Sequence, residues 1–190
     1  TLTGNISAAV GTAHGIRINA ASTVVVNGNL SGSYYGQPCI LVNASGAVLT
    51  VTGTANVSGM QSTVLVSAVQ PCTITYNGNV TGGAAGANGV FLSLEATCTV
   101  TINGTVTGGA GAGSHAIASS GAATITVNGT VAGGSNATAY GISLTGPSTV
   151  TVTGTTTGGS AGAAIMTTSA ASIVDMQGTC TASTGAPAYV

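Results

Sequence analysis

The sequence predicts an all-β fold, a three-sided parallel β-solenoid of about eight coils with a repeat of about 25 residues. Three observations lead to this prediction. A glycine recurs at nearly constant spacing, apolar and polar residues alternate around it, and no segment has the length and composition of a helix.

The recurring glycine, called here the marker glycine, usually follows Asn or Thr and returns every 24 to 26 residues along the 190-residue chain. A repeat of this length is typical of solenoids, in which each unit buries its apolar face against its neighbours. We therefore expect one domain over residues 1–190. The marker glycines are Gly4, Gly28, Gly53, Gly78, Gly104, Gly129, Gly154 and Gly178.

The residues around each marker glycine predict three short strands in every repeat. Before Gly129, for example, apolar Ile125 and Val127 flank polar Thr126, which is the period of a strand with one buried face. A second apolar position, such as Val131, follows two residues after the glycine. After a variable loop, segments such as "GIRI" and "YGISL" predict the third strand. Stacked repeats would then place equivalent residues about 4.8 Å apart.

The composition excludes several classes of function. Charged residues make up 2% of the chain, against about 25% in ordinary soluble domains. No basic patch can bind nucleic acid, and no apolar stretch of about 18 residues predicts membrane insertion. The few acid–base groups are spread apart, with His14 and His115 four repeats from each other and Glu95 three from Asp175. We therefore expect no enzyme, no metal site and no cofactor.

The repeat motif "T-[VI]-T-[VI]-[NT]-G-[NT]-V-T-G-G" recurs in full or degraded form along the chain. It resembles the parallel β-helix repeats of bacterial, archaeal and phage surface proteins, which include adhesins, fibre shafts, and sheath or envelope-layer subunits. The resemblance implies a structural role at a surface. It transfers no functional residue, because the motif specifies a shape.

Two of the four cysteines occupy one column of the repeat. Cys72 and Cys98 each stand six residues before a marker glycine, so stacking would bring their Cα atoms within disulfide range. We expect either a disulfide, which would imply an oxidising extracellular compartment, or two stacked free thiols at a tight corner. Cys39 and Cys180 fall in different columns and are either buried small residues or intermolecular thiols.

Outward threonines form the clearest candidate surface, a ladder of one residue per repeat three positions before the marker glycine. Such a ladder stabilises a sheet by itself, and a flat, uncharged array of hydroxyls and methyls is also suited to ordering water at an ice surface. Val25 and Asp175 interrupt it near the two ends. The ladder residues are Thr50, Thr75, Thr101, Thr126 and Thr151.

Two further features concern the surface. Eight Asn-x-Ser/Thr sequons occur, most of them produced by the repeat itself, and Asn136 is the best acceptor for a glycan because it lies in a variable loop. The aromatic residues Tyr34, Tyr35, Phe91 and Tyr140 are expected in loops or facing outward, where they would contact a partner subunit or sugars.

These observations favour a structural, self-assembling protein of the extracellular space or cell surface, with any leader absent from this chain. Open solenoid ends and the lack of charge repulsion favour end-to-end stacking and lateral packing of copies into a fibre, sheath or surface layer. The alternative is a binding module, either ice-binding through the threonines or an adhesin or phage receptor-binding segment.

Overall fold

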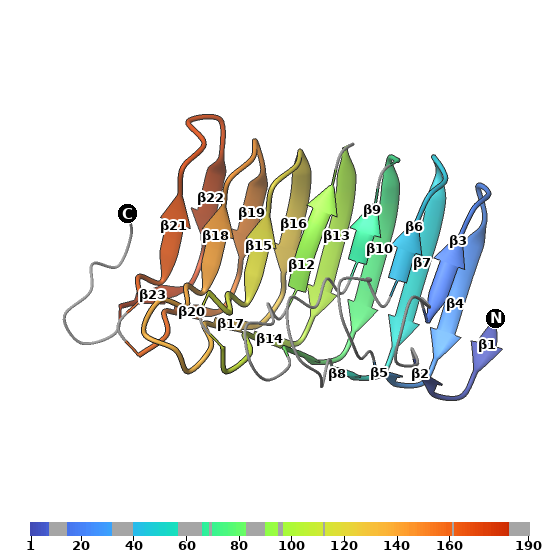
Figure 1. Ribbon diagram of the computed structural model, residues 1–190, viewed down its shortest axis with the longest axis horizontal. Coiled ribbons are helices and arrows are strands. Elements are labelled where there is room, and N and C mark those ends of the chain that lie inside the picture. Colours follow the sequence, from blue (N-terminus) through green and yellow to red (C-terminus); the bar gives the residue numbers. More distant parts are fainter. Residues whose placement is uncertain are drawn as a thin grey trace.

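The computed structural model describes residues 1–7, 15–31, 40–56, 66–68, 70–82, 90–94, 97–111, 113–160 and 162–182. Over these residues the chain is an all-β parallel β-solenoid without helix, as the repeat predicts. Short strands stack side by side from one end of the molecule to the other, so that β1 and β23 lie at opposite ends (Figure 1).

The described strands form three parallel sheets, and neighbours within a sheet are always three strands apart in the chain. Sheet A contains β1 (Leu2–Thr3), β4 (Thr23–Asn27), β7 (Ala47–Thr52), β10 (Cys72–Asn77), β13 (Cys98–Asn103), β16 (Ala123–Val127), β19 (Thr149–Val152) and β22 (Ile173–Met176). These are the strands that the sequence predicts before each marker glycine.

Sheet B follows the marker glycines, and sheet C follows the variable loops. Sheet B contains β2 (Ile6–Ser7), β5 (Leu30–Ser31), β8 (Ala55–Asn56), β11 (Val80–Thr81), β14 (Thr105–Thr107), β17 (Thr130–Ala132), β20 (Thr155–Thr157) and β23 (Thr179–Thr181). Sheet C contains β3 (Ile16–Ile18), β6 (Ile40–Val42), β9 (Val66–Ala68), β12 (Val90–Leu94), β15 (Ile117–Ser119), β18 (Ile142–Leu144) and β21 (Ile165–Thr167). We use "rung" for the neighbouring strands of the three sheets at one level of the stack.

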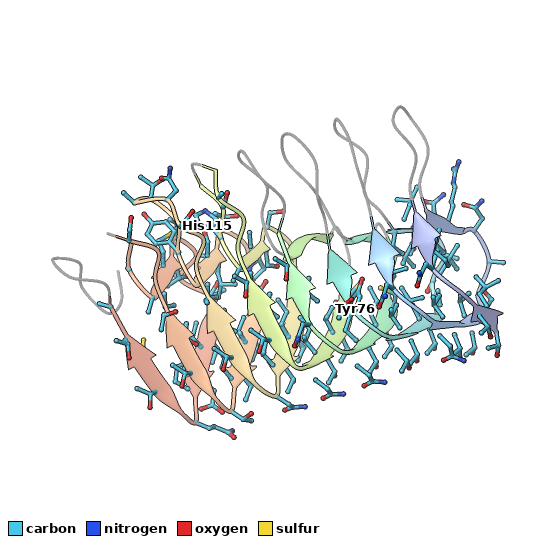
Figure 2. All side chains as sticks on the ribbon, turned by 90° about the horizontal axis from the view of Figure 1, so that it is seen from below. Tyr76 and His115 are labelled. Atoms are coloured by element: carbon cyan, nitrogen blue, oxygen red, sulfur yellow. The ribbon has the colours of Figure 1, made fainter. Side chains whose placement is uncertain are left out.

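The core lies between the sheets and is built from columns of apolar side chains. In β13, Val100 and Ile102 are fully buried, whereas Thr99 and Asn103 are exposed, so the predicted alternation of inward and outward residues is confirmed. Parallel pairing repeats this alternation in register from strand to strand. Tyr76 is the bulkiest fully buried side chain and occupies a column otherwise filled by smaller apolar residues (Figure 2).

The marker glycines allow successive turns to approach closely. A Cβ at Gly129 would overlap the carbonyl oxygen of Gly104 in the preceding turn. At Gly53 a side chain would overlap the Gly28 carbonyl oxygen, and the backbone also adopts φ of 145°, which residues with a Cβ rarely adopt. The repeated glycine is therefore a steric requirement of stacking at this corner.

Within the described residues, no helix has the length and apolar character needed to cross a membrane.

The alternation predicts a large difference between two neighbouring residues of β16. Replacing buried Ile125 by Ala leaves a cavity and should lower the free energy of unfolding by about 2–5 kcal/mol. The matched change Thr124→Ala, on the exposed face, should change it by about 0.5 kcal/mol or less. Denaturant unfolding followed by far-UV circular dichroism measures both, and equal effects would contradict the assigned faces.

Candidate binding and modification sites

The outward face of sheet A carries paired threonines on four successive strands. Their Cα atoms pair in register, Thr73 with Thr99 and Thr124 with Thr149 being examples, and each strand repeats the pattern two residues later. We call this surface the threonine array: Thr73, Thr75, Thr99, Thr101, Thr124, Thr126, Thr149 and Thr151. All eight side chains are exposed or partly exposed.

Strand geometry gives the array regular dimensions. Neighbouring strands are about 4.8 Å apart, and residues two positions apart along one strand are separated by about 6.7 Å. Thr50 continues one column beyond the array, but exposed Val48 replaces its companion. At the other end Ile173 and Asp175 occupy the two columns, so the array is interrupted where the sequence predicts. The array offers hydroxyls and methyls in rows, without charge.

A ladder of asparagine amides runs beside the threonine array. The Asn103 Nδ2 donates a hydrogen bond to the Asn77 Oδ1 at 2.7 Å, and the Asn128 Nδ2 donates to the Asn103 Oδ1 at 2.7 Å. Asn103, in the middle, thus serves as donor towards Asn77 and as acceptor towards Asn128, as the primary amide allows because it carries both an N–H donor and a carbonyl acceptor. The ladder links three rungs along the stacking direction.

A second set of asparagines, directly after the marker glycines, forms hydrogen bonds with backbone N–H groups. The Oδ1 atoms of Asn5, Asn29 and Asn79 accept hydrogen bonds from the backbone N–H groups of Asn29, Thr54 and Thr105 in the next turn, at 2.9–3.0 Å. From the sequence alone, these residues are expected only as glycosylation sequons. The signal that identifies them is the restriction of this column to Asn and Thr in every repeat.

Cys72 and Cys98 lie at the start of β10 and β13, at the corner between sheets C and A. Their Sγ atoms are 2.9 Å apart and are present as free thiols. The Cys72 thiol donates to the Cys98 Sγ, and the Cys98 thiol contacts the Gln70 carbonyl oxygen at 3.3 Å. Both side chains are buried, so each thiol has the other as its nearest reactive group.

The two thiols differ in acidity because one donates to the other. The hydrogen bond from Cys72 lowers the pKa of Cys98, whereas the same hydrogen bond, together with burial, raises the pKa of Cys72. Cys98 is therefore the thiol that ionises first. A shallow depression of the surface reaches Cys72 and is lined by Ser45, Gly46, Ala47, Pro71, Cys72, Thr73, Thr97 and Thr99.

The other candidate site residues that the sequence predicts do not come together in one site among the described residues. Cys180 lies in β23, in the column of buried Val131 and Thr156, and burial raises the pKa of its thiol. Asp175 is exposed in β22, and its carboxylate accepts a hydrogen bond from Gln177 at 3.0 Å. His14, Tyr34, Tyr35, Cys39 and Glu95 lie outside the described residues, as does the side chain of Phe91.

His115 and Tyr140 form a contact that sequence reasoning did not anticipate. They belong to the loops before β15 and β18, and their rings stack with centroids 4.9 Å apart and planes inclined by 17°. The Tyr140 backbone N–H also donates to the His115 Nδ1 at 3.0 Å. The sequence signal is positional, because each residue stands two places before the first residue of the next sheet C strand.

Asn136 lies off the strands, as predicted, in the loop between β17 and β18. Its Oδ1 accepts hydrogen bonds from both the backbone N–H and the hydroxyl of Thr138, the third residue of the sequon, at 3.1 and 3.0 Å. By contrast, Asn103 and Asn128 use their Nδ2 atoms in the asparagine ladder.

Among the described residues, no three His, Cys, Asp or Glu side chains come together as metal ligands. A second shallow depression, at the carboxyl ends of strands β11, β14 and β17 of sheet B, is lined mainly by glycines that include Gly108, Gly133 and Gly134. Packing accounts for these glycines, since a Cβ at Gly108 would overlap the Ser114 carbonyl oxygen and one at Gly134 would overlap that of Gly109.

No protein-family model matches this chain, and neither a curated protein nor a solved structure matches it. Its class is therefore given by its architecture, that of the parallel β-solenoid repeat proteins.

Proposed function

We propose that this chain is a structural, self-assembling protein, a subunit or segment of an extracellular fibre, sheath or surface layer. In the finer form of this proposal, residues 1–190 make eight three-sided coils, one for each marker glycine. The two eight-stranded sheets and the seven-stranded third sheet support that count. The proposed activity is assembly and requires neither a catalytic residue nor a cofactor.

The observation that carries the proposal is the state of the core columns at the two edge rungs. Leu2 and Met176 occupy the column that contains Val26, Val51, Tyr76, Ile102, Val127 and Val152. All six of these are fully buried, whereas Leu2 is 48% exposed and Met176 is partly exposed. Within the described residues, the apolar surface that the inner rungs bury is thus exposed at the two edge rungs.

A second copy stacked head to tail would cover this surface without a change of register. The Met176 of one copy would then meet the Leu2 of the next, and Cys180 would meet Ile6, because each pair shares a column. The unpaired backbone groups of edge strands β22 and β1 would also find partners. Burial of such side chains contributes about 1.5–3 kcal/mol each.

Low charge favours the same association. Arg17, exposed in β3, and Asp175, exposed in β22, are the described residues with charged side chains, and they lie near opposite ends of the stack. A charge repeated in a column would repel its own copy about 4.8 Å away. The uncharged threonine array would also allow lateral packing between rods.

The extracellular part of the proposal rests on Cys72 and Cys98. Oxidation would form an Sγ–Sγ bond and release two protons and two electrons to an oxidant such as a small-molecule disulfide. The Cα atoms lie in neighbouring, paired strands, which suits the 4.4–6.8 Å range of disulfides. Such a bond persists in oxidising compartments, outside the cytosol. Cys98, the thiol that ionises first, would attack the small-molecule disulfide and release one thiolate, and Cys72 would then displace the second thiolate to form the Cys72–Cys98 bond.

The threonine array favours a second candidate function, ice binding. Eight threonines in two columns over four strands present a regular, uncharged lattice of hydroxyls and methyls. Such a surface can hold water in a fixed pattern, because every position repeats at the same spacing. The interruption by Val48 on one side and Ile173 on the other limits the array to four consecutive strands, β10, β13, β16 and β19.

We expect the purified chain to form rods that lengthen with protein concentration in negative-stain micrographs. Met176→Glu and Leu2→Glu should each block one end, so that substoichiometric amounts of either variant shorten wild-type rods. Thr124→Glu, on the outward face of an inner strand, should leave rod length unchanged. Circular dichroism checks that the variants fold. A monodisperse wild-type chain at millimolar concentration would overturn the proposal.

Oxidation should join Cys72 to Cys98 and lower the mass of the intact chain by two hydrogen atoms, with the linkage located by peptide mapping. Because the bond closes a loop across 26 residues, it should raise the free energy of unfolding by about 3 kcal/mol. Cys98→Ser should abolish this gain, and Cys180→Ser should retain it. An oxidised protein in which both thiols still react with alkylating reagents after unfolding would contradict the bond.

If the second candidate is correct, the chain should separate the melting and freezing temperatures of an ice crystal beyond a control protein of equal concentration. Thr126→Tyr, in the middle of the array, should abolish that separation, and Thr167→Tyr, exposed on sheet C, should preserve it. Failure of the wild-type chain to produce any separation excludes ice binding and leaves the assembly proposal standing.

A further inference from the structure

The loops before β15 and β18 lie against each other in successive rungs and are joined through a small number of bonds. The Gly134 N–H donates to the Ser114 carbonyl oxygen at 3.1 Å, and the Gly113 N–H donates to the Thr138 Oγ1 at 3.3 Å. The Ala116 N–H donates to the Tyr140 carbonyl oxygen at 3.2 Å. Figure 2 shows His115 in this loop region, away from buried Tyr76.

The bond between the Tyr140 N–H and the His115 Nδ1 differs from the others because its acceptor can be protonated. An imidazole nitrogen accepts a hydrogen bond only when it carries no proton, so the 3.0 Å contact requires neutral His115 with its proton on Nε2. Protonation turns Nδ1 into a donor that faces the Tyr140 N–H. The protonated Nδ1 can then no longer accept the hydrogen bond from the Tyr140 N–H.

Among the described residues, no charged side chain lies beside His115. The sequence contains no Asp, Glu, Lys or Arg between Glu95 and Asp175, an interval that includes both loops and strands β14 to β21. The titratable group facing His115 from the following loop is the Tyr140 phenol, and the preceding loop, residues 83–89, contains no titratable side chain. Burial lowers the pKa of His115, because it disfavours the positively charged form of the imidazole.

We propose that His115 and Tyr140 form an acid-sensitive clasp between the two loops, closed when His115 is neutral and opened by its protonation. This inference is independent of the assembly proposal. It assigns a switching role to one of the two histidines in the chain. Opening exposes the Tyr140 backbone N–H and separates the stacked rings, and the sheets remain paired.

The direction of the pH effect follows from the two states of the clasp. In the open state His115 is solvated and titrates near its ordinary pKa of 6.5, whereas in the closed state its pKa is lower. The open state therefore binds the proton more tightly. The clasp is fully stable above about pH 6.5 and loses stability as the pH falls towards the lower pKa of the closed state.

Amide hydrogen exchange read by nuclear magnetic resonance tests the clasp at a single atom. The protection factor of the Tyr140 N–H should fall as the His115 imidazole protonates, by up to about tenfold per pH unit, the limit for one proton. Protection of the Ile125 N–H in sheet A should stay constant. The imidazole resonances of His115, recorded in the same samples, give its protonation state.

Two variants separate the clasp from a general acid effect. In His115→Asn the Oδ1 occupies the place of Nδ1 and accepts without titrating, so protection of the Tyr140 N–H should persist and lose its pH dependence. In His115→Phe the ring stack remains without an acceptor, so the amide should exchange rapidly at every pH. His14→Asn controls for the other histidine and should behave as wild type. Constant protection while His115 titrates in the wild type, or an undiminished acid effect in His115→Asn, would overturn the proposal.

Discussion

Parallel stacking in exact register is the constraint on which the rest of this structure depends. Each paired residue of the described strands has a counterpart about 4.8 Å away in the neighbouring strand, so a favourable or unfavourable pair is repeated along the molecule. Apolar residues build continuous core columns in this way. Threonines form rows, and asparagines form a ladder in which the amide of one strand donates to the amide of its neighbour. The same repetition makes charge costly, which accounts for a composition with 2% charged residues.

Most of the fold could be predicted because register converts sequence period directly into position. Once Gly104 and Gly129 are aligned, the identities of Ile102 and Val127 show that both point inward, and burial agrees. Strands shorter than six residues are also identifiable here, since each is supported by its copies in other repeats. The variable loops have less of this support, because their sequences and lengths differ from repeat to repeat.

The contacts missed by sequence reasoning involve atoms whose partners are not set by column identity. His115 occurs once in its column, and its stacking on Tyr140 depends on the paths of two loops of different sequence. The asparagines after the marker glycines bind backbone N–H groups, which every residue except proline possesses, so composition does not reveal the partner. The Cys72–Cys98 proximity could be derived because both residues lie on strands in one column.

Register also affects folding, because each repeat must pair with the correct neighbouring repeat. Repeats with near-identical strands could exchange neighbours by one full unit and still bury valines on valines and place threonines beside threonines. The native pairing of repeats is distinguished by features that break the repetition. These are Tyr76 in its column, two cysteines in adjacent strands, and unequal spacings of 24 to 26 residues between marker glycines. These irregularities make individual repeats distinguishable. The departures from perfect repetition therefore specify which repeat pairs with which.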